Sequence, residues 1–150
     1  MTSYAPLLAK ENHTQWSPDL IYFNNREVKP TTGYYVQKLY GQNAGSHYIP
    51  SQIILDNQDN RVKLRIGSSI VRDSKTGDVI VKLVNLLPVS VETEIQLPGI
   101  GSVQPSAVRT VLAGAPESTP LPVTDTIEVG ANFKQQLPAY SFTVIRLKTK

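Results

Sequence analysis

Glu92 and Glu94 are two carboxylates whose spacing suits a pair that works as general acid and general base. They lie within the stretch VSVETEIQL, in which apolar and polar residues alternate. Because successive side chains of a strand point to opposite faces, Glu92 and Glu94 share the face opposite the apolar residues, which is the solvent side. Exposed carboxylates have little reason for the raised pKa that a general acid needs. The sequence therefore favours a solvent-facing pair over a catalytic pair.

Metal, nucleotide and nucleophile motifs are also weak in this sequence. His13 and His47 lie far apart and outside any cluster with ligand spacing. The run 56–60 has oxygen side chains like a calcium loop, but it lacks the central glycine and the distant glutamate. Neither a GxSxG elbow nor a GxGxxG or Walker-type loop is present. We expect no metal site and no cofactor.

Composition and charge exclude several classes of partner. The net charge is +3, but the basic residues are scattered from Lys10 to Lys150 without interleaved aromatic residues, so no nucleic acid partner is expected. Arg61, Lys63 and Arg65 alternate as the solvated face of one strand would. The sequence has no cysteine and no apolar stretch of about 20 residues, so it predicts neither disulfides nor a membrane span.

From about residue 46 onward the pattern is that of a mainly β protein. The stretches RVKLRIGSSIV and VSVETEIQL alternate, with Val62, Leu64, Ile66 and Ile70 inward in the first and Val89 to Leu97 in the second. DVIVKLVNLL is apolar on both faces, as in a central strand, and SFTVIRLKTK forms the last strand. Turn residues separate these stretches at 74–78, 98–101 and 116–122. The pattern predicts an antiparallel β-sandwich, jelly-roll-like in form.

The first third of the chain has a different pattern. Residues 19–24 form an apolar run between Pro18 and two asparagines, which predicts a short buried strand. Residues 31–41 carry an apolar stripe at helical spacing, with Thr31 or Thr32 as a cap and Gly41 as an end. We expect Tyr4–Lys10 to end a preceding helix. One β/α unit cannot bury both faces of its strand, so we predict a terminal segment of a larger domain over 1–45 and a β-sandwich domain over 46–150.

Asn24 and Asn25 are the candidate site residues. In a β/α barrel, residues just past the carboxyl end of a strand line the active-site face, whereas the beginning of the strand, here Asp19, is structural. That position predicts Asn24 and Asn25 at the rim of a substrate site. The alternative is that they only form a turn, since asparagine is a favoured turn residue.

Three ordered motifs carry a resemblance to a known family. They are MTSYAPLLA, WSPDLIYFNN and TTGYYVQKLYGQNAG. They resemble the end of the catalytic barrel in α-L-arabinofuranosidases of glycoside hydrolase family 51, whose members commonly read M-x-S-Y-A-P-L, W-x-P-D-L-I-x-F-D-N and T-P-S-Y-x-V-Q-x-L-F. The ending LPAYSFTVIRL is similar to the last strand of the sandwich that follows that barrel. Asn24 replaces an aspartate and Thr32 a proline of the pattern, and both keep turn or capping chemistry.

The resemblance implies a retaining glycosidase whose two catalytic glutamates lie on earlier barrel strands. The family's acid/base follows an asparagine, whereas Asn25 is followed here by Arg26, and Glu27 matches no catalytic motif. We therefore assign no catalytic residue, and Met1 matches an internal methionine of the family motif. The resemblance implies a structural, inactive fragment whose partners are the rest of the barrel and, through the parent enzyme, an arabinose-containing polysaccharide or oligosaccharide. The alternative is an autonomous carbohydrate-binding module.

Overall fold

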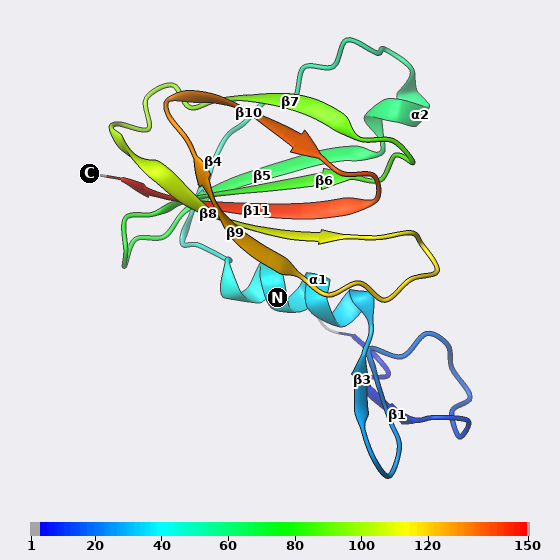
Figure 1. Ribbon diagram of the computed structural model, residues 1–150. Coiled ribbons are helices and arrows are strands. Elements are labelled where there is room, and N and C mark those ends of the chain that lie inside the picture. Colours follow the sequence, from blue (N-terminus) through cyan, green and yellow to red (C-terminus); the bar gives the residue numbers. More distant parts are fainter. Residues whose placement is uncertain (1–3, 150) are drawn as a thin grey trace.

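A computed structural model describes residues 4–149 of the chain (Figure 1). In chain order the elements are β1 (Leu8–Lys10), β2 (Ile21–Phe23), β3 (Val28–Pro30), α1 (Thr32–Gln42), β4 (His47–Ile49), α2 (Asn60–Lys63), β5 (Ile66–Arg72), β6 (Val79–Asn85), β7 (Val91–Gln96), β8 (Val103–Ala113), β9 (Val123–Glu128), β10 (Asn132–Leu137) and β11 (Ser141–Thr149). Strands dominate, and the antiparallel β-sandwich predicted from the alternating segments is confirmed. Neither of the helices within residues 4–149 is long and apolar enough to cross a membrane.

The larger layer is a six-stranded sheet in the order β4-β5-β6-β11-β8-β9. All of its neighbouring strands are antiparallel. The predicted central strand is confirmed as β6, and β11, the predicted last strand, lies beside it. Val79, Ile80 and Ile145 are each 0% exposed. These two strands are therefore buried on both faces, which explains why their sequences are apolar without alternation.

The smaller layer is the antiparallel pair β7 and β10, which packs on one face of the six-stranded sheet (Figure 1). Ile95 and Leu97 of this layer join the inward side chains of β6 and β11 in one cluster. Glu92 and Glu94 point away from that cluster and are exposed, as the alternation predicted. The cluster consists of Val79, Val81, Leu83, Ile95, Leu97, Ala107, Leu137, Ile145 and Leu147.

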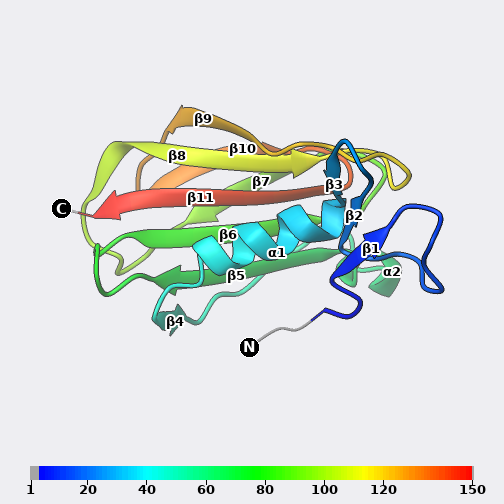
Figure 2. The ribbon, with the colours of Figure 1, turned by 90° about the horizontal axis from the view of Figure 1, so that it is seen from below.

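Helix α1 covers the opposite face of the six-stranded sheet (Figures 1 and 2). Its buried residue Leu39 packs with Ile80 and Val144, and the ring of Tyr40 stacks on that of Phe142 with centroids 4.7 Å apart. Lys82 lies beneath the end of the helix, where its Nζ donates to the Asn43 carbonyl at 2.7 Å. Burial lowers the pKa of this ammonium group. The predicted apolar stripe of the helix is thus the surface that binds the sheet.

The predicted turns lie between strands. Residues 74–78 connect β5 to β6 with Gly77 at φ +78°, and residues 98–101 lie between β7 and β8 with Gly99 at φ +73°. A positive φ is a conformation that glycine adopts without steric cost. The proline-rich stretch from Pro116 to Pro122 connects β8 to β9.

Two expectations about strand faces are wrong. Residues 60–63 form a helical turn instead of a strand, because the Asp59 carboxylate accepts the Arg61 N–H at 2.8 Å and caps it. Leu64 is consequently 85% exposed, and the expected strand face of Arg61, Lys63 and Arg65 does not exist. Val89 is 58% exposed because it precedes β7, in a turn where its carbonyl accepts from Asn85 Nδ2.

The first third forms a small three-stranded sheet beside one end of α1 (Figures 1 and 2). The predicted strand exists as β2, and helix α1 follows it closely to the predicted bounds, ending one residue past Gly41. The expected helix end over Tyr4–Lys10 is wrong, since Leu8–Lys10 is strand β1 and pairs in parallel with β2. In this segment Leu7 and Leu8 are exposed and Ala9 is buried, so the segment does not bury the apolar stripe of a helix.

We expect Leu39→Ala to destabilise the chain by about 2–5 kcal/mol, because it removes a buried side chain between α1 and the sheet. Urea unfolding followed by circular dichroism measures this change. Val28→Ala is the control, since Val28 is 64% exposed and its loss should change the unfolding free energy by less than about 0.5 kcal/mol. An unchanged midpoint for Leu39→Ala would contradict the packing of α1 on the sheet.

Candidate functional site

A cluster of polar side chains lies at the carboxyl ends of β1 and β2. Glu11 directly follows β1, and Asn24 directly follows β2. Because the two strands are parallel, their carboxyl ends meet at the same edge of the small sheet. The Asn24 Nδ2 donates to Glu11 Oε2 at 2.7 Å, so the two strand ends are joined directly.

The side chain of Asn24 also closes the turn between β2 and β3. Its Oδ1 accepts from the backbone N–H groups of Arg26 at 2.8 Å and Glu27 at 3.0 Å. The backbone N–H of Asn24 donates to the Glu27 carbonyl at 3.0 Å. This is an Asx-type turn, in which the side chain replaces a backbone partner. Both ends of the Asn24 amide are therefore occupied by interactions that hold the loop.

Lys29, from β3, completes the cluster electrostatically. Its Nζ lies 2.8 Å from Glu11 Oε1 and 3.1 Å from Glu27 Oε1. The hydrogen bond from Lys29, followed by that from Asn24, lowers the pKa of the Glu11 carboxyl below its ordinary value. The hydrogen bonds to Glu11 and Glu27 raise the pKa of Lys29. Glu11 is therefore held as a carboxylate, which can accept hydrogen bonds but is unsuited to donate a proton as a general acid.

Asn25, unlike Asn24, makes no side-chain hydrogen bond that holds the turn. Its side chain is exposed and makes no hydrogen bond to any other residue within 4–149. An amide offers both donors and an acceptor, which is the chemistry that recognises hydroxyl groups. Asn25 and Arg26 are thus exposed side chains of this loop that could contact a ligand without breaking the turn.

Asp19 lies at the other end of β2 and is fully buried. Its Oδ2 accepts from Thr14 Oγ1 at 3.0 Å, and its backbone N–H donates to the Tyr22 hydroxyl at 2.8 Å. These contacts fasten the loop of residues 11–20 to the start of the strand. Asp19 Oδ1 is buried without a hydrogen-bond partner among residues 4–149, so the structural role expected of Asp19 stays a prediction.

The other residues considered from the sequence do not converge. His13 and His47 are exposed, and the His47 ring nitrogen Nδ1 lies 3.0 Å from Ser46 Oγ. Glu92 pairs with Lys134 at 2.9 Å on the outer surface of the small layer. Over residues 4–149 no group of three His, Asp or Glu side chains could hold a metal ion.

Sequence reasoning missed Glu11 and Lys29. The cluster depends on Leu8–Lys10 being a strand, since only then does Glu11 follow a strand end as Asn24 does. The available signal was the repeat of one local pattern: Pro6 precedes the apolar residues of β1, and Pro18 precedes those of β2. A proline before a short apolar run favours a strand start over a helix end.

We expect Lys29→Met to raise the pKa of Glu11 toward its ordinary value, because the largest cause of the lowered pKa is removed. Side-chain carboxyl NMR across an acid titration measures it. Since folding lowers this pKa, the Glu11 carboxylate favours the folded state above the unfolded pKa, and that contribution is lost as the pH falls through the folded pKa. Lys75→Met, at an exposed turn, should leave the Glu11 titration unchanged, and an equal response of both variants would refute the assignment.

Comparison with known proteins gives a consistent result along the chain. The family model "Alpha-L-arabinofuranosidase C-terminal domain" matches residues 1–141. The chain is 31% identical to a probable α-L-arabinofuranosidase A of Aspergillus terreus over 156 residues, which covers 97% of the chain and 23% of that protein. It is 50% identical over 52 residues to an extracellular exo-α-L-arabinofuranosidase of Streptomyces chartreusis, which covers 35% of the chain and 6% of that protein.

Solved structures agree with these relatives. An arabinose-bound family 51 α-L-arabinofuranosidase, MgGH51, superposes with a TM-score of 0.85 and 33% identity over 99% of the chain and 24% of its own length. The Thermotoga maritima α-L-arabinofuranosidase shares the fold, with a TM-score of 0.70 at 14% identity over 85% of the chain and 31% of its own length. The chain therefore spans about a quarter or less of the curated relatives that it matches. From the match over residues 1–141, the chain belongs to the α-L-arabinofuranosidase C-terminal domain family.

Proposed function

We propose that this chain is the C-terminal accessory region of a longer α-L-arabinofuranosidase and is itself structural and inactive. The observation that carries this proposal is the family match over residues 1–141, together with relatives of which the chain covers only 23% and 24%. The longer enzyme would be a retaining glycosidase that releases terminal arabinofuranose from arabinan or arabinoxylan. Its catalytic glutamates would lie on barrel strands outside this chain.

The proposed role of the sandwich is to stabilise the barrel. In this proposal residues 1–45 are the terminal part of the barrel, residues 46–150 are the sandwich, and α1 is the covalent brace between them. Two contacts support it. Thr31 bonds through its N–H and its hydroxyl to the Leu20 carbonyl, at 3.1 and 2.8 Å, which ties the start of α1 to β2. The other end of α1 is held on the sandwich by Leu39 and Tyr40.

The proposed substrate rim consists of Asn24 and Asn25. Active-site residues of β/α barrels lie past the carboxyl ends of the parallel strands, which is where the cluster of Glu11 and Asn24 lies. Within the rim the two asparagines have separate roles. Asn24 holds the loop in shape, and Asn25 presents its amide to a sugar hydroxyl of the substrate.

This chain should not hydrolyse an aryl α-L-arabinofuranoside, because in this proposal both catalytic glutamates lie on barrel strands outside it. The measurement is release of 4-nitrophenol from 4-nitrophenyl α-L-arabinofuranoside against a buffer blank. Turnover above the blank that disappears in Glu27→Gln would overturn the proposal that the fragment is inactive.

The two asparagines should respond differently to alanine. Asn24→Ala should lower the unfolding free energy of this chain by about 1 kcal/mol or more, since it removes several hydrogen bonds, whereas Asn25→Ala should change it by less than about 0.5 kcal/mol. In the longer enzyme, Asn25→Ala should lower kcat/KM by roughly tenfold, about 1.4 kcal/mol of transition-state stabilisation. An unchanged kcat/KM in Asn25→Ala would remove Asn25 from the rim.

A further inference from the structure

Residues 114–122, which connect β8 to β9, form a loop that folds back on itself. The Ser118 N–H and hydroxyl both donate to the Ala115 carbonyl, at 2.9 and 2.6 Å. A Cβ placed on Gly114 would lie 2.6 Å from Ser118 Oγ and 2.9 Å from Pro120 Cγ, so the loop is packed tightly against its own beginning. Compact loops that are packed by their own side chains are frequently functional. Residues 114–122 are called the β8–β9 loop below.

The base of the β8–β9 loop is held by a residue with a strained backbone. Tyr140 has φ +47°, in the left-handed region that a bulky side chain rarely adopts. Its carbonyl accepts from the Gly114 N–H at 3.3 Å, and its N–H donates to the Leu87 carbonyl at 3.1 Å. The loop is therefore fixed, where it leaves β8, by a backbone conformation that costs free energy. Strain of this kind occurs preferentially at functional sites.

The β8–β9 loop also contacts helix α1. Thr32 is the first residue of α1, and its Oγ1 donates to the Ser118 carbonyl at 3.3 Å, across 86 positions of the sequence. Figures 1 and 2 show the loop beside the start of α1, at the end of the sandwich where the small sheet also lies. The loop is thus a part of the sandwich that reaches the first third of the chain.

The contact with α1 relates the loop to the substrate rim. In the proposed function α1 is a barrel helix, and the helices of a β/α barrel form a ring outside the strands. Each helix begins after the loop that follows its strand, so its first turn lies toward the active-site face. An element that rests on the first turn of α1 is therefore on the active-site side but outside the ring. It meets a substrate only where the substrate extends beyond the barrel.

The tip of the β8–β9 loop presents side chains that can bind a sugar. Glu117 and Thr119 are exposed, and Leu121 is 66% exposed. None of the ion pairs within residues 4–149 involves Glu117. A carboxylate accepts hydrogen bonds from hydroxyl groups, and a threonine hydroxyl both donates and accepts them. An exposed leucine gains from covering the apolar face of a sugar ring.

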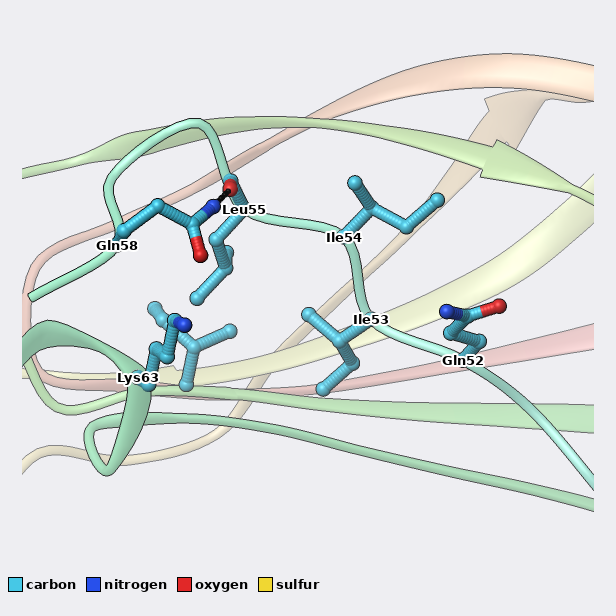
Figure 3. A pocket seen from close by; sticks show the side chains of 7 residues that line it. Gln52, Ile53, Ile54, Leu55, Gln58 and Lys63 are labelled. Atoms are coloured by element: carbon cyan, nitrogen blue, oxygen red, sulfur yellow. Dashed lines mark hydrogen bonds between the residues drawn. The ribbon is translucent and has the colours of Figure 1, made fainter. Parts of the chain in front are cut away.

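A hollow of the sandwich lies on the other side of the six-stranded sheet. Figure 3 shows this hollow, which has a volume of about 330 Å³ and is lined in part by Ile53, Ile54 and Lys63. Ile66, also in the lining, points to the same face of β5 as Ile70, which packs against the inner cluster. The hollow therefore faces away from α1, and we place no part of the substrate in it.

We infer that the β8–β9 loop is a second contact site for the polysaccharide, beyond the terminal arabinofuranose, an inference that rests on the proposed function. The ligand is the neutral pentose chain from which the terminal sugar is released. Glu117 and Thr119 bond to its hydroxyl groups, and Leu121 packs on a ring. Gly114 and Tyr140 are positioning residues, because they act by holding the loop. Residues 114–122 contain no aromatic residue, so the site adds to the rim and does not make the sandwich an autonomous module.

Two substrates of different size test the site in the longer enzyme. Glu117→Ala combined with Thr119→Ala removes two polar side chains of the tip and keeps the Ser118 carbonyl that Thr32 contacts. The kcat/KM for arabinan should fall by about fivefold or more, through a higher KM. The kcat/KM for 4-nitrophenyl α-L-arabinofuranoside should stay the same, because this small substrate does not extend beyond the barrel. An unchanged kcat/KM for arabinan would overturn the site. An equal fall for both substrates would also overturn it, in favour of a loop that only braces α1.

The matched control is Glu94→Ala combined with Gln96→Ala. These two polar side chains are exposed on the outer surface of β7, on the side of the sandwich away from α1. The control should leave kcat/KM unchanged for both substrates. A fall for arabinan equal to that of the loop variant would overturn the assignment of the contact to the β8–β9 loop.

A second variant tests whether the shape of the loop matters. Gly114→Ala places a Cβ against Ser118 and Pro120, so the loop must shift. The kcat/KM for arabinan should fall by about threefold or more, while that for the aryl arabinofuranoside stays the same. Gly41→Ala is the control, since a Cβ at Gly41 would have open space around it within residues 4–149. An unchanged kcat/KM for arabinan in Gly114→Ala would overturn the loop as a site of fixed shape.

Turnover by the unmodified longer protein separates this inference from the proposed function. Turnover on both substrates without any response to the loop variants would remove the contact site and leave the proposed function in place. Absence of turnover on both substrates would remove the proposed function and the contact site together.

Discussion

The need to cover both faces of β6 and β11 is the constraint on which the rest of the structure depends. Ile80 on one face and Ile145 on the other are completely buried, although the two strands belong to one sheet. α1 covers the face of Ile80, and β7 and β10 cover the face of Ile145. Helix α1 belongs to the first third of the chain and begins directly after β3 of the small sheet. One face of the sandwich is therefore covered by a helix from outside the sandwich region. The covering of the sheet by α1 even buries the ammonium group of Lys82. Burial lowers the pKa of this group, and its Nζ donates a hydrogen bond to the Asn43 carbonyl.

The same constraint explains which elements could be predicted from the sequence. β6 and β11 are apolar on both faces because they are covered twice, and β7 alternates because one of its faces meets solvent. Helix α1 was predictable because its stripe is the complement of the outer sheet face. In each case burial by a distant partner leaves a pattern in the local sequence: an unbroken apolar run, an alternation or a helical stripe. The ends of α1, β6, β7 and β11 were predicted to within two residues.

Two segments that were predicted wrongly are held by contacts that leave no such pattern. β1 has only three residues, and its strand character comes from pairing with β2 across the loop of residues 11–20. The turn at 60–63 is decided by one carboxylate, that of Asp59, against an alternating pattern that suggested a strand. Glu11 and Lys29 escaped notice for the same reason, because their meeting depends on the register of three short strands. Asn24 and Asn25 were visible because they directly follow a recognisable strand end.

Phe133 and Phe142 do not offer the exposed aromatic face that an autonomous carbohydrate-binding module would use, whereas Tyr48 on β4 is 66% exposed. A sugar platform needs an exposed aromatic face, because that face packs on the apolar side of the ring. Phe142 is instead buried against Tyr40, and Phe133 packs on the inner core. The exposed Trp16 belongs to the first third, where its backbone N–H donates to Thr14 Oγ1, the hydroxyl that donates to Asp19 Oδ2. That contact places Trp16 near the start of β2, whereas Asn24 and Asn25 follow the end of the same strand. The exposed indole therefore lies at the opposite end of β2 from the proposed rim.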